Sequence, residues 1–138
     1  MIALSIRQPW AELFMRGEKE PYNHSEYGKV NIEYRSRATN IRGRLYIYAS
    51  LSRYNRKDEE DLAKKYDLDM NSLPRGVIIG TIELAGCDDG DWYMKNPKLL
   101  LEPRKPARRA NPVWFYPFDE DVPKGRNAKK RGRINFHK

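Results

Sequence analysis

Residues 4–19, LSIRQPWAELFMRGEK, carry much of the information about the fold. The short apolar segment at residues 2–6 is rich in strand-forming residues and runs into a Gln-Pro pair, so it predicts a first β-strand closed by a turn. Pro9 suits the first turn of a helix, where its missing N–H is not needed. Apolar side chains then recur at helical spacing until Gly17, which predicts a helix that ends there.

The second informative stretch is residues 32–50, IEYRSRATNIRGRLYIYAS. Apolar and polar residues alternate at residues 31–35 and again at 44–50, as in half-buried strands. Residues 39–43 between them have the composition of a turn. Residues 18–30 are polar and rich in turn formers, so an exposed loop or a hairpin is expected there.

The remainder of the chain carries weaker signals. The segment at residues 58–66 begins with acidic residues and continues with lysines. This order of charges complements the helix dipole and predicts a second helix there. Gly80 inside the most apolar stretch indicates a bulge or a close backbone approach. Residues 88–98 are expected to form a loop, and residues 103–112 a basic loop punctuated by prolines. The remaining expected elements are a helix at 58–66 and strands at 77–84, 99–101 and 113–118.

Five to six strands with two helices between them predict a small α+β fold, a mixed or antiparallel β-barrel. At 138 residues the chain is about one domain long. It contains no internal repeat and no linker that would separate two domains. One domain is therefore expected at residues 1–120, followed by a basic tail at residues 121–138.

The charge of the chain points to a class of partner. The formal net charge is +8 at pH 7 and the isoelectric point is about 9.6. A field of this sign attracts polyanions such as nucleic acids. No apolar run approaches the ~20 residues that span a bilayer, and the first ten residues lack the basic start and long apolar stretch of a signal peptide. We therefore expect a cytoplasmic protein without a membrane partner.

Cysteine and histidine are scarce. Cys87 is the only cysteine, which leaves no intrachain disulfide, no cysteine-based zinc site and no CxxC pair. His24 and His137 lie far apart without metal-ligand spacing. No metal and no cofactor are expected, and the chain is expected to be a monomer.

Four short motifs occur in a characteristic order. They are Gln8-Pro9-Trp10, Gly17-Glu18-Lys19, Glu33-Tyr34-Arg35 and Arg42-Gly43-Arg44. With strands at 80–84 and 113–115 after them, the sequence resembles the ASCH domain family, named for activating signal cointegrator, over roughly residues 2–118. The resemblance implies a PUA-like barrel with a polar pocket lined from these motifs. In the family the Lys and the Glu lie three residues apart, whereas an insertion separates them here.

The family's lysine position has two candidates in this chain. Lys19 stands at the family's distance from Trp10, whereas Lys29 lies four residues before Glu33. Lys19 is favoured because the intervening residues 20–30 can bulge outward. That insertion is expected to lengthen one wall of the pocket or to act as a lid.

The residue types of these motifs suit a polar ligand independently of the resemblance. A Lys and a Glu that face each other in a cleft form a pair that tolerates partial burial. Arg35 adds a planar fork able to grip phosphate or a base edge, and Gln8 offers both donors and acceptors. We predict a ligand-binding pocket of Gln8, Trp10, Lys19, Glu33 and Arg35, in which Lys19 and Glu33 would be the catalytic pair of an enzyme. A structural ion pair with surface arginines is the alternative.

Basic residues outside the pocket form a second group. We expect them to contact a nucleic-acid backbone: Arg42, Arg44, Arg104, Lys105, Arg108, Arg109, Lys129, Lys130 and Arg131. Aromatic residues among them, Tyr46, Tyr48 and Trp92, suit the stacking of single-stranded bases. The alternatives are a basic surface that only confers solubility, and aromatic rings that pack in the core.

Pocket and charge together predict a module that binds RNA, another single-stranded nucleic acid, a nucleoside or a nucleotide. The resemblance leaves two other functions open. One is a small hydrolase acting on modified nucleosides such as acetylcytidine, or on RNA. Acetylcytidine amidohydrolases of this fold use a Lys, a Thr and a distant Glu, and Glu33 occupies the Thr position here, so that triad is not reproduced. The other is a protein-interaction module in transcriptional or translational regulation.

Overall fold

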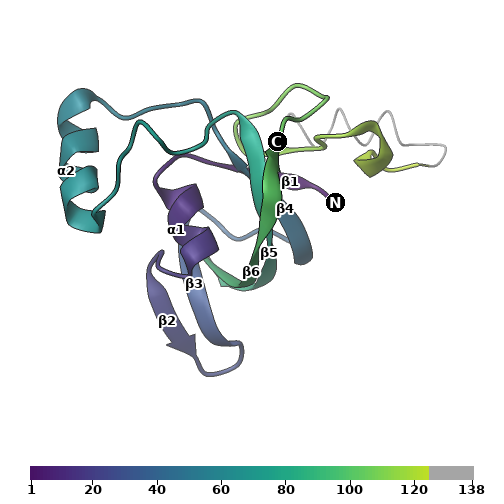
Figure 1. Ribbon diagram of the computed structural model, residues 1–138. Helices are drawn as coiled ribbons and strands as arrows, with labels where there is room; N and C mark the ends of the chain where they lie inside the picture. Colours follow the sequence, from purple (N-terminus) through teal and green to yellow (C-terminus); the bar gives the residue numbers. More distant parts are fainter. Residues whose placement is uncertain (125–138) are drawn as a thin grey trace.

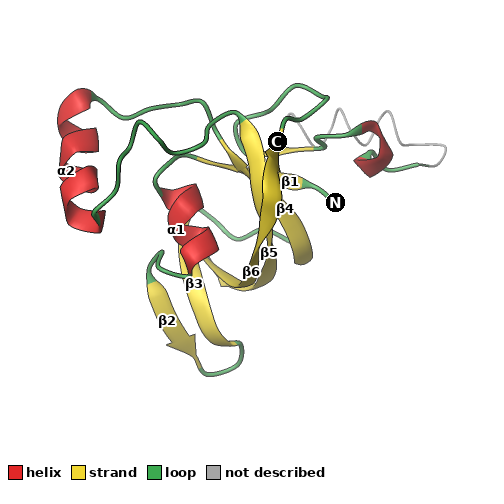
Figure 2. Cartoon of the chain, in the orientation of Figure 1, coloured by secondary structure: helices red, strands yellow, loops and turns green. Residues whose placement is uncertain are grey.

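The computed structural model describes residues 1–124. It contains a curved sheet with one helix against it and a second helix standing apart (Figures 1 and 2). In chain order the elements are β1 (Ala3–Ile6), α1 (Trp10–Arg16), β2 (Pro21–His24), β3 (Gly28–Tyr34), β4 (Gly43–Ala49), α2 (Arg56–Tyr66), β5 (Val77–Asp88), β6 (Asp91–Arg104), β7 (Trp114–Phe115) and the 3-10 helix η1 (Asp119–Asp121).

All seven strands belong to one sheet in the order β2-β3-β6-β5-β4-β1-β7. β1 runs parallel to β4 and antiparallel to β7, and the other neighbouring strands are antiparallel. The predicted α+β class with a mixed sheet is confirmed. The sheet has seven strands rather than five or six, and within residues 1–124 its outermost strands, β2 and β7, do not pair to close a barrel.

β1 lies inside the sheet and joins two apolar layers. Its four residues are all buried, and successive side chains point to opposite faces. Leu4 and Ile6 pack with Phe14 of α1 in the main core. Ala3 belongs to a second cluster with Phe115 of β7. The short apolar start of the chain thus becomes the strand around which both sides of the sheet pack.

The absence of a side chain at Gly80 allows α1 and β6 to pack closely against β5. A Cβ atom at Gly80 would collide with the side chain of Met15 and with the carbonyl oxygen of Lys98. The register of β5 against β6 also shifts between Ile78 and Gly80. The bulge and close approach expected from a glycine in this apolar strand are both confirmed.

The segment at residues 88–98, expected to be a loop, is mostly strand. β5 continues to Asp88, and β6 begins at Asp91 after a tight turn. The prediction was wrong because the Asp, Gly, Asn and Pro residues of this segment are turn formers. Burial of residues 92–94 between β3 and β5 outweighs that local preference.

The last strand is shorter than predicted. β7 covers only Trp114 and Phe115 instead of residues 113–118. Pro117 follows it closely, and a proline cannot donate to the ladder. Beyond β7 the chain forms η1, and the terminal amino group of Met1 lies 2.9 Å from the Asp121 carboxylate.

α2 begins two residues before the predicted helix because of its cap. The Asn55 side chain accepts a hydrogen bond from the backbone N–H of Asp58 at 2.8 Å. This interaction satisfies a donor that the first turn of a helix leaves unpaired. The helix then runs to Tyr66, as predicted.

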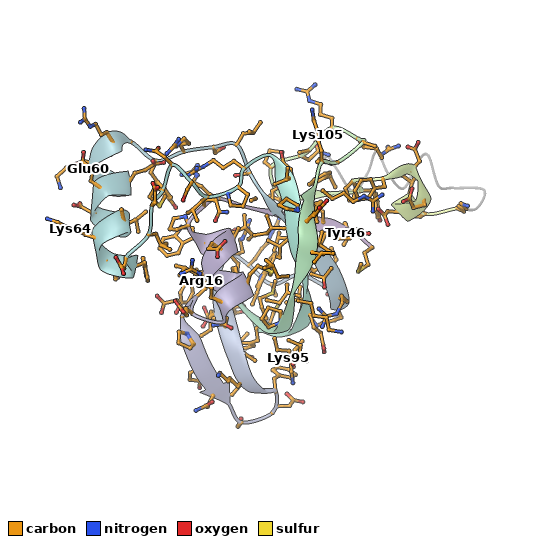
Figure 3. All side chains as sticks on the ribbon, in the orientation of Figure 1. Arg16, Tyr46, Glu60, Lys64, Lys95 and Lys105 are labelled. Carbon is orange, nitrogen blue, oxygen red and sulfur yellow. The ribbon has the colours of Figure 1, made fainter. Side chains whose placement is uncertain are left out.

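α2 has little contact with the sheet. None of its residues is buried, and Figure 3 shows Glu60 and Lys64 projecting from its outer side. The Tyr66 ring lies edge-on to Trp10 of α1, with ring centroids 5.7 Å apart. This contact places α2 and the loops that carry it next to the start of α1. Within residues 1–124 no helix is long and apolar enough to cross a membrane.

Candidate ligand-binding cleft

A cleft of about 780 Å³ opens beside β1, β3 and the start of α1. Ligand sites typically have volumes of roughly 300–1,000 Å³. Residues from the loop after β4 and from the loop before β7 complete its walls. The described residues that line it are Ser5, Ile6, Arg7, Trp10, Lys19, Glu20, Glu33, Tyr34, Arg35, Tyr48, Ser50, Leu51, Ser52, Tyr54, Ala110, Asn111 and Pro112.

The predicted Lys and Glu face each other in this cleft. Lys19 Nζ lies 3.6 Å from Glu33 Oε1 and donates a 2.7 Å hydrogen bond to the carbonyl oxygen of Ile32. Lys19 is 7% exposed and Glu33 is 9% exposed. α1 ends at Gly17 in the left-handed conformation, which turns the chain back so that Lys19 reaches β3.

Arg35 completes a row of three charges. Its Nε donates a 2.8 Å hydrogen bond to Glu33 Oε2, and its Nη2 forms an ion pair with the same oxygen at 2.7 Å. Nη2 also donates to the carbonyl oxygen of Ser5 at 3.3 Å. Glu33 therefore has one oxygen toward each cation, as a buried carboxylate requires. The cluster as a whole retains one positive charge.

The Lys19 amine lies among aromatic rings. Nζ is 4.9 Å from the ring centroid of Tyr34, 5.4 Å from that of Phe14 and 5.6 Å from that of Trp10. Burial lowers the pKa of Lys19 from its ordinary value, and the Glu33 carboxylate partly opposes this shift. A lowered pKa increases the fraction of neutral amine, which is the nucleophilic form.

The inserted residues 20–30 form β2 and the start of β3. Lys29 lies on the exposed side of this hairpin opposite Asn23 and does not line the cleft. The lysine beside Glu33 is therefore Lys19. Figure 1 shows the hairpin projecting away from the rest of the chain. Of the insertion, only Glu20 lines the cleft, so the insertion is not a lid in this conformation.

Gln8 does not line the cleft, contrary to the prediction. It is fully buried, its Nε2 donates to the carbonyl oxygen of Pro74, and its Oε1 accepts from the backbone N–H of Glu12, both at 2.9 Å. The turn at the start of α1 directs the amide inward, where both ends satisfy the backbone. Trp10 does line the cleft, and its Nε1 donates to the Tyr54 hydroxyl at 2.7 Å.

Several lining residues were not singled out from the sequence, among them Arg7, Tyr54 and Asn111. The Arg7 guanidinium lies 4.5 Å from the ring centroid of Tyr54. The carbonyl oxygen of Asn111 accepts a 2.6 Å hydrogen bond from the Ser5 hydroxyl. Arg7 directly precedes the Gln-Pro-Trp motif, and this position could have identified it as a residue of the cleft. No local pattern marks the other two, because distant loops bring them to the cleft.

Several of the predicted backbone-binding arginines are engaged within the fold. Arg44 donates to groups on β5 and β6 at 2.9 Å each. Arg104 and Arg108 form ion pairs with acidic residues of η1, at 3.6 and 3.1 Å. Arg42 donates to two carbonyl groups of its own loop. These contacts occupy hydrogen-bond donors and neutralise charge on the four side chains, so less of both is left for a polyanion.

Two of the predicted basic residues remain available. Lys105 and Arg109 are exposed, and within residues 1–124 neither forms an ion pair. Figure 3 shows Lys105 pointing away from the sheet. Lys129, Lys130 and Arg131 lie outside the described residues.

The aromatic residues proposed for base stacking are mostly internal. Tyr48 and Trp92 are 5% and 4% exposed. The Trp92 Nε1 donates to the carbonyl oxygen of Arg37 at 2.9 Å, and Tyr46 lies edge-on to Phe118. Tyr48 and Trp92 therefore follow the alternative reading, in which the rings pack in the core.

The potential metal ligands of the described chain are dispersed. Within residues 1–124, no group of three or more His, Cys, Asp or Glu side chains comes together in a way that would hold a metal ion. Cys87 is a free thiol.

Comparison with known proteins gives a distant similarity. No protein-family model matches the chain. Activating signal cointegrator 1 from Homo sapiens is 32% identical to it over 91 residues, and the Mus musculus protein of the same name is 33% identical over 91 residues. Each similarity covers 61% of this chain. The chain spans only 14% of the length of these curated relatives.

Proposed function

We propose that this chain is an RNA- or nucleotide-binding module of the ASCH type, with a PUA-like fold and a base-recognition site in the cleft at Lys19, Glu33 and Arg35. The observation that carries the proposal is this row of charges. A carboxylate held between two cations lines a cleft of ligand size, in a chain with a net charge of +8. The similarity to activating signal cointegrator 1 supports the ASCH assignment.

The cleft offers the groups that a nucleotide needs. Arg7 is exposed and stacked on Tyr54 at the rim, a geometry that keeps its planar fork ready for phosphate. Asn111 supplies an amide with both donors and acceptors. The rings of Trp10 and Tyr34 supply apolar surface for a base.

We further propose that residues 1–120 form the domain and that residues 121–138 act as a basic tail. Lys105 and Arg109 would join the tail, including Lys129, Lys130 and Arg131, in contacting the nucleic-acid backbone. The module would act as a cytoplasmic monomer. RNA is the preferred partner, and a free nucleoside or nucleotide is the minimal ligand.

The test is binding of a labelled single-stranded RNA, measured by fluorescence anisotropy over a range of salt concentrations. The logarithm of the association constant is expected to fall linearly with the logarithm of salt, by about 0.7 per phosphate contacted. Arg7→Ala is expected to weaken binding. Arg56→Ala removes the same charge from the exposed side of α2 and is expected to leave the affinity for RNA unchanged. A flat salt response, or no binding of RNA, DNA or nucleotides at low salt, would overturn the proposal.

The lowered pKa of Lys19 favours a second candidate function, hydrolysis of a modified nucleoside or of RNA. The neutral Lys19 amine would then take a proton from the water that attacks the substrate, and that proton would pass to the leaving group, with Glu33 as the group that exchanges protons with Lys19. The test is incubation with acetylcytidine and with single-stranded RNA at high protein concentration. Turnover that is lost in Lys19→Met would support it. Unchanged substrates with both the natural chain and the variant would exclude it.

A further inference from the structure

A second groove, of about 1,120 Å³, adjoins the cleft. The described residues that line it are Ile2, Arg35, Ser36, Arg37, Ala38, Thr39, Asn40, Ile41, Trp92, Asn111, Pro112, Val113, Trp114 and Tyr116. It shares Arg35, Asn111 and Pro112 with the cleft. We infer that the two form one continuous binding surface, and that the groove holds the nucleotides next to the one whose base lies in the cleft. The inference rests on the proposed RNA-binding function and extends it.

Arg35 stands at the junction of the two spaces. Its Nη2 donates to the carbonyl oxygen of Ser5, which lines the cleft. Its guanidinium carbon lies 5.4 Å from the ring centroid of Trp92, which lines the groove. Nε and Nη2 are engaged by Glu33 and Ser5, whereas Nη1 makes no hydrogen bond within residues 1–124. Nη1 can therefore donate to a phosphate that joins two nucleotides across the junction.

The opposite side of the junction is also fixed. The Ser5 hydroxyl donates to the carbonyl oxygen of Asn111 at 2.6 Å, and the Ser5 backbone N–H donates to the carbonyl oxygen of Val113 at 2.9 Å. These two bonds attach residues 111–113 to β1. The passage between cleft and groove is thus built from an anchored loop and an anchored arginine.

The charge of the groove has one sign. Arg35 and Arg37 line it, and none of its lining residues is Asp or Glu. Arg37 is exposed, and no ion pair holds its guanidinium within residues 1–124. Its carbonyl oxygen accepts from Trp92 Nε1, which fixes the backbone at this point. Arg35 is paired with Glu33, which lies outside the groove lining, so the Arg37 guanidinium is the unpaired positive charge that a phosphate in the groove would meet.

Aromatic surface lies beside this charge. The rings of Trp92 and Trp114 stack with centroids 5.7 Å apart and an interplanar angle of 13°. Trp92 is buried beneath, whereas Trp114 is half-buried and lines the groove. Aromatic and cationic side chains side by side are the usual means of holding single-stranded nucleic acid without reading its sequence. In this arrangement the cleft selects a base and the groove holds its neighbours.

The first test compares ligands of different length. Dissociation constants are measured by calorimetry for a ribonucleoside monophosphate and for a tetraribonucleotide. The tetranucleotide is expected to bind more tightly. Arg37→Ala is expected to reduce tetranucleotide affinity and to shrink its salt slope by about 0.7, with the monophosphate affinity unchanged. Arg56→Ala, which removes the same charge from α2, is the matched control.

The outcomes separate the groove from the cleft. Equal affinity for both ligands, or the same behaviour of Arg37→Ala and Arg56→Ala, would overturn the groove and leave the cleft standing. Absence of binding by any nucleotide or oligonucleotide would overturn both. Tighter tetranucleotide binding that depends on Arg37 would support the groove.

Tryptophan fluorescence gives a second readout, because the three tryptophans of the chain divide between the two spaces. Trp10 lines the cleft, and Trp92 and Trp114 line the groove. In Trp10→Phe the remaining fluorescence reports the groove alone. A saturating tetranucleotide is expected to quench it, and a saturating monophosphate is not. Equal quenching by both ligands, or by neither, would contradict the inference.

Discussion

Glu33 is the residue on which the charges of the cleft depend. It accepts from Arg35 through one oxygen and faces Lys19 with the other. Without it, two cations would remain close together, one of them almost completely buried. Breaking a buried ion pair by removal of one partner costs several kcal/mol, whereas replacing the pair with apolar residues is often nearly neutral.

We expect Glu33→Ala to lower the free energy of unfolding by about 3 kcal/mol, measured by urea denaturation. The double variant Lys19→Met/Glu33→Leu is expected to recover most of that loss, because it also removes the buried amine. Glu60→Ala breaks an exposed pair with Arg56 and is expected to leave the unfolding midpoint nearly unchanged. A Glu33→Ala midpoint equal to that of Glu60→Ala would show that the cluster does not contribute to stability.

Local sequence identified the charged members of the cleft but not the direction of every side chain. Lys19, Glu33 and Arg35 were found because each belongs to a short motif, and their charges must pair when they are buried. Gln8 was misassigned because the same motif contains it, although the turn at the start of α1 directs its amide inward. Asn111 was missed because only the folded sheet brings it to Ser5.

Among the elements, the hairpin of β2 and β3 is held by an aromatic cluster. The His24 ring lies 4.6 Å from that of Tyr27 and 4.5 Å from that of Tyr93, between centroids. The Tyr93 hydroxyl donates to Asp88 at 2.9 Å. That hydrogen bond, together with burial, raises the pKa of Tyr93 to about 12. The hairpin is thereby tied to the turn between β5 and β6.

This raised pKa predicts how stability changes at high pH. The unfolded chain loses the Tyr93 proton near the ordinary pKa of 10.0, and the folded chain keeps it until about pH 12. The stabilisation is therefore complete below pH 10 and is lost as pH rises through 12. The free energy of unfolding, measured with denaturant, is expected to fall less steeply between pH 9 and pH 12 in Tyr93→Phe than in the natural chain. Identical pH profiles would show that the hydrogen bond is not maintained in solution.

α2 is expected to open more easily than the sheet, since none of its residues is buried. Replacing a helix cap with alanine typically costs about 1 kcal/mol. For Asn55→Ala we expect the amides of residues 56–66 to exchange about fivefold faster, while those of β5 are unchanged. Hydrogen exchange followed by NMR measures both sets in one sample. Equal acceleration in α2 and β5 would mean that the helix opens only with the whole domain.

The elements that the sequence predicted correctly are those with a clear local period. β4 alternates buried and partly exposed residues at its start, and α2 has charges that follow the helix dipole. The first part of β6, residues 91–98, was taken for a loop because its turn-forming residues oppose strand formation locally, whereas the predicted strand at 99–101 lies within β6. Pairing with β5 and β3 overrides that preference, and such pairing is decided by distant residues.

At the scale of the whole molecule, positive charge is concentrated at the end of the chain. Residues 125–138 contain six Lys or Arg and no acid, so their removal lowers the formal net charge from +8 to +2. Within the described residues, several arginines are already paired with acids or with backbone carbonyls. The cleft and the groove therefore contain few unpaired cationic side chains that could bind a phosphate. The tail is accordingly expected to supply most of the salt-dependent affinity.

Removing residues 125–138 is expected to reduce the slope of log affinity against log salt by up to about 4, since each lost phosphate contact contributes about 0.7. The monophosphate, which lies in the cleft, is expected to bind both chains equally. A full-length variant with the six basic residues changed to Gln separates charge from chain length, and it is expected to behave like the shortened chain. If both variants keep the original slope, the phosphate contacts belong to the exposed Lys105 and Arg109 and to the arginines of the groove instead.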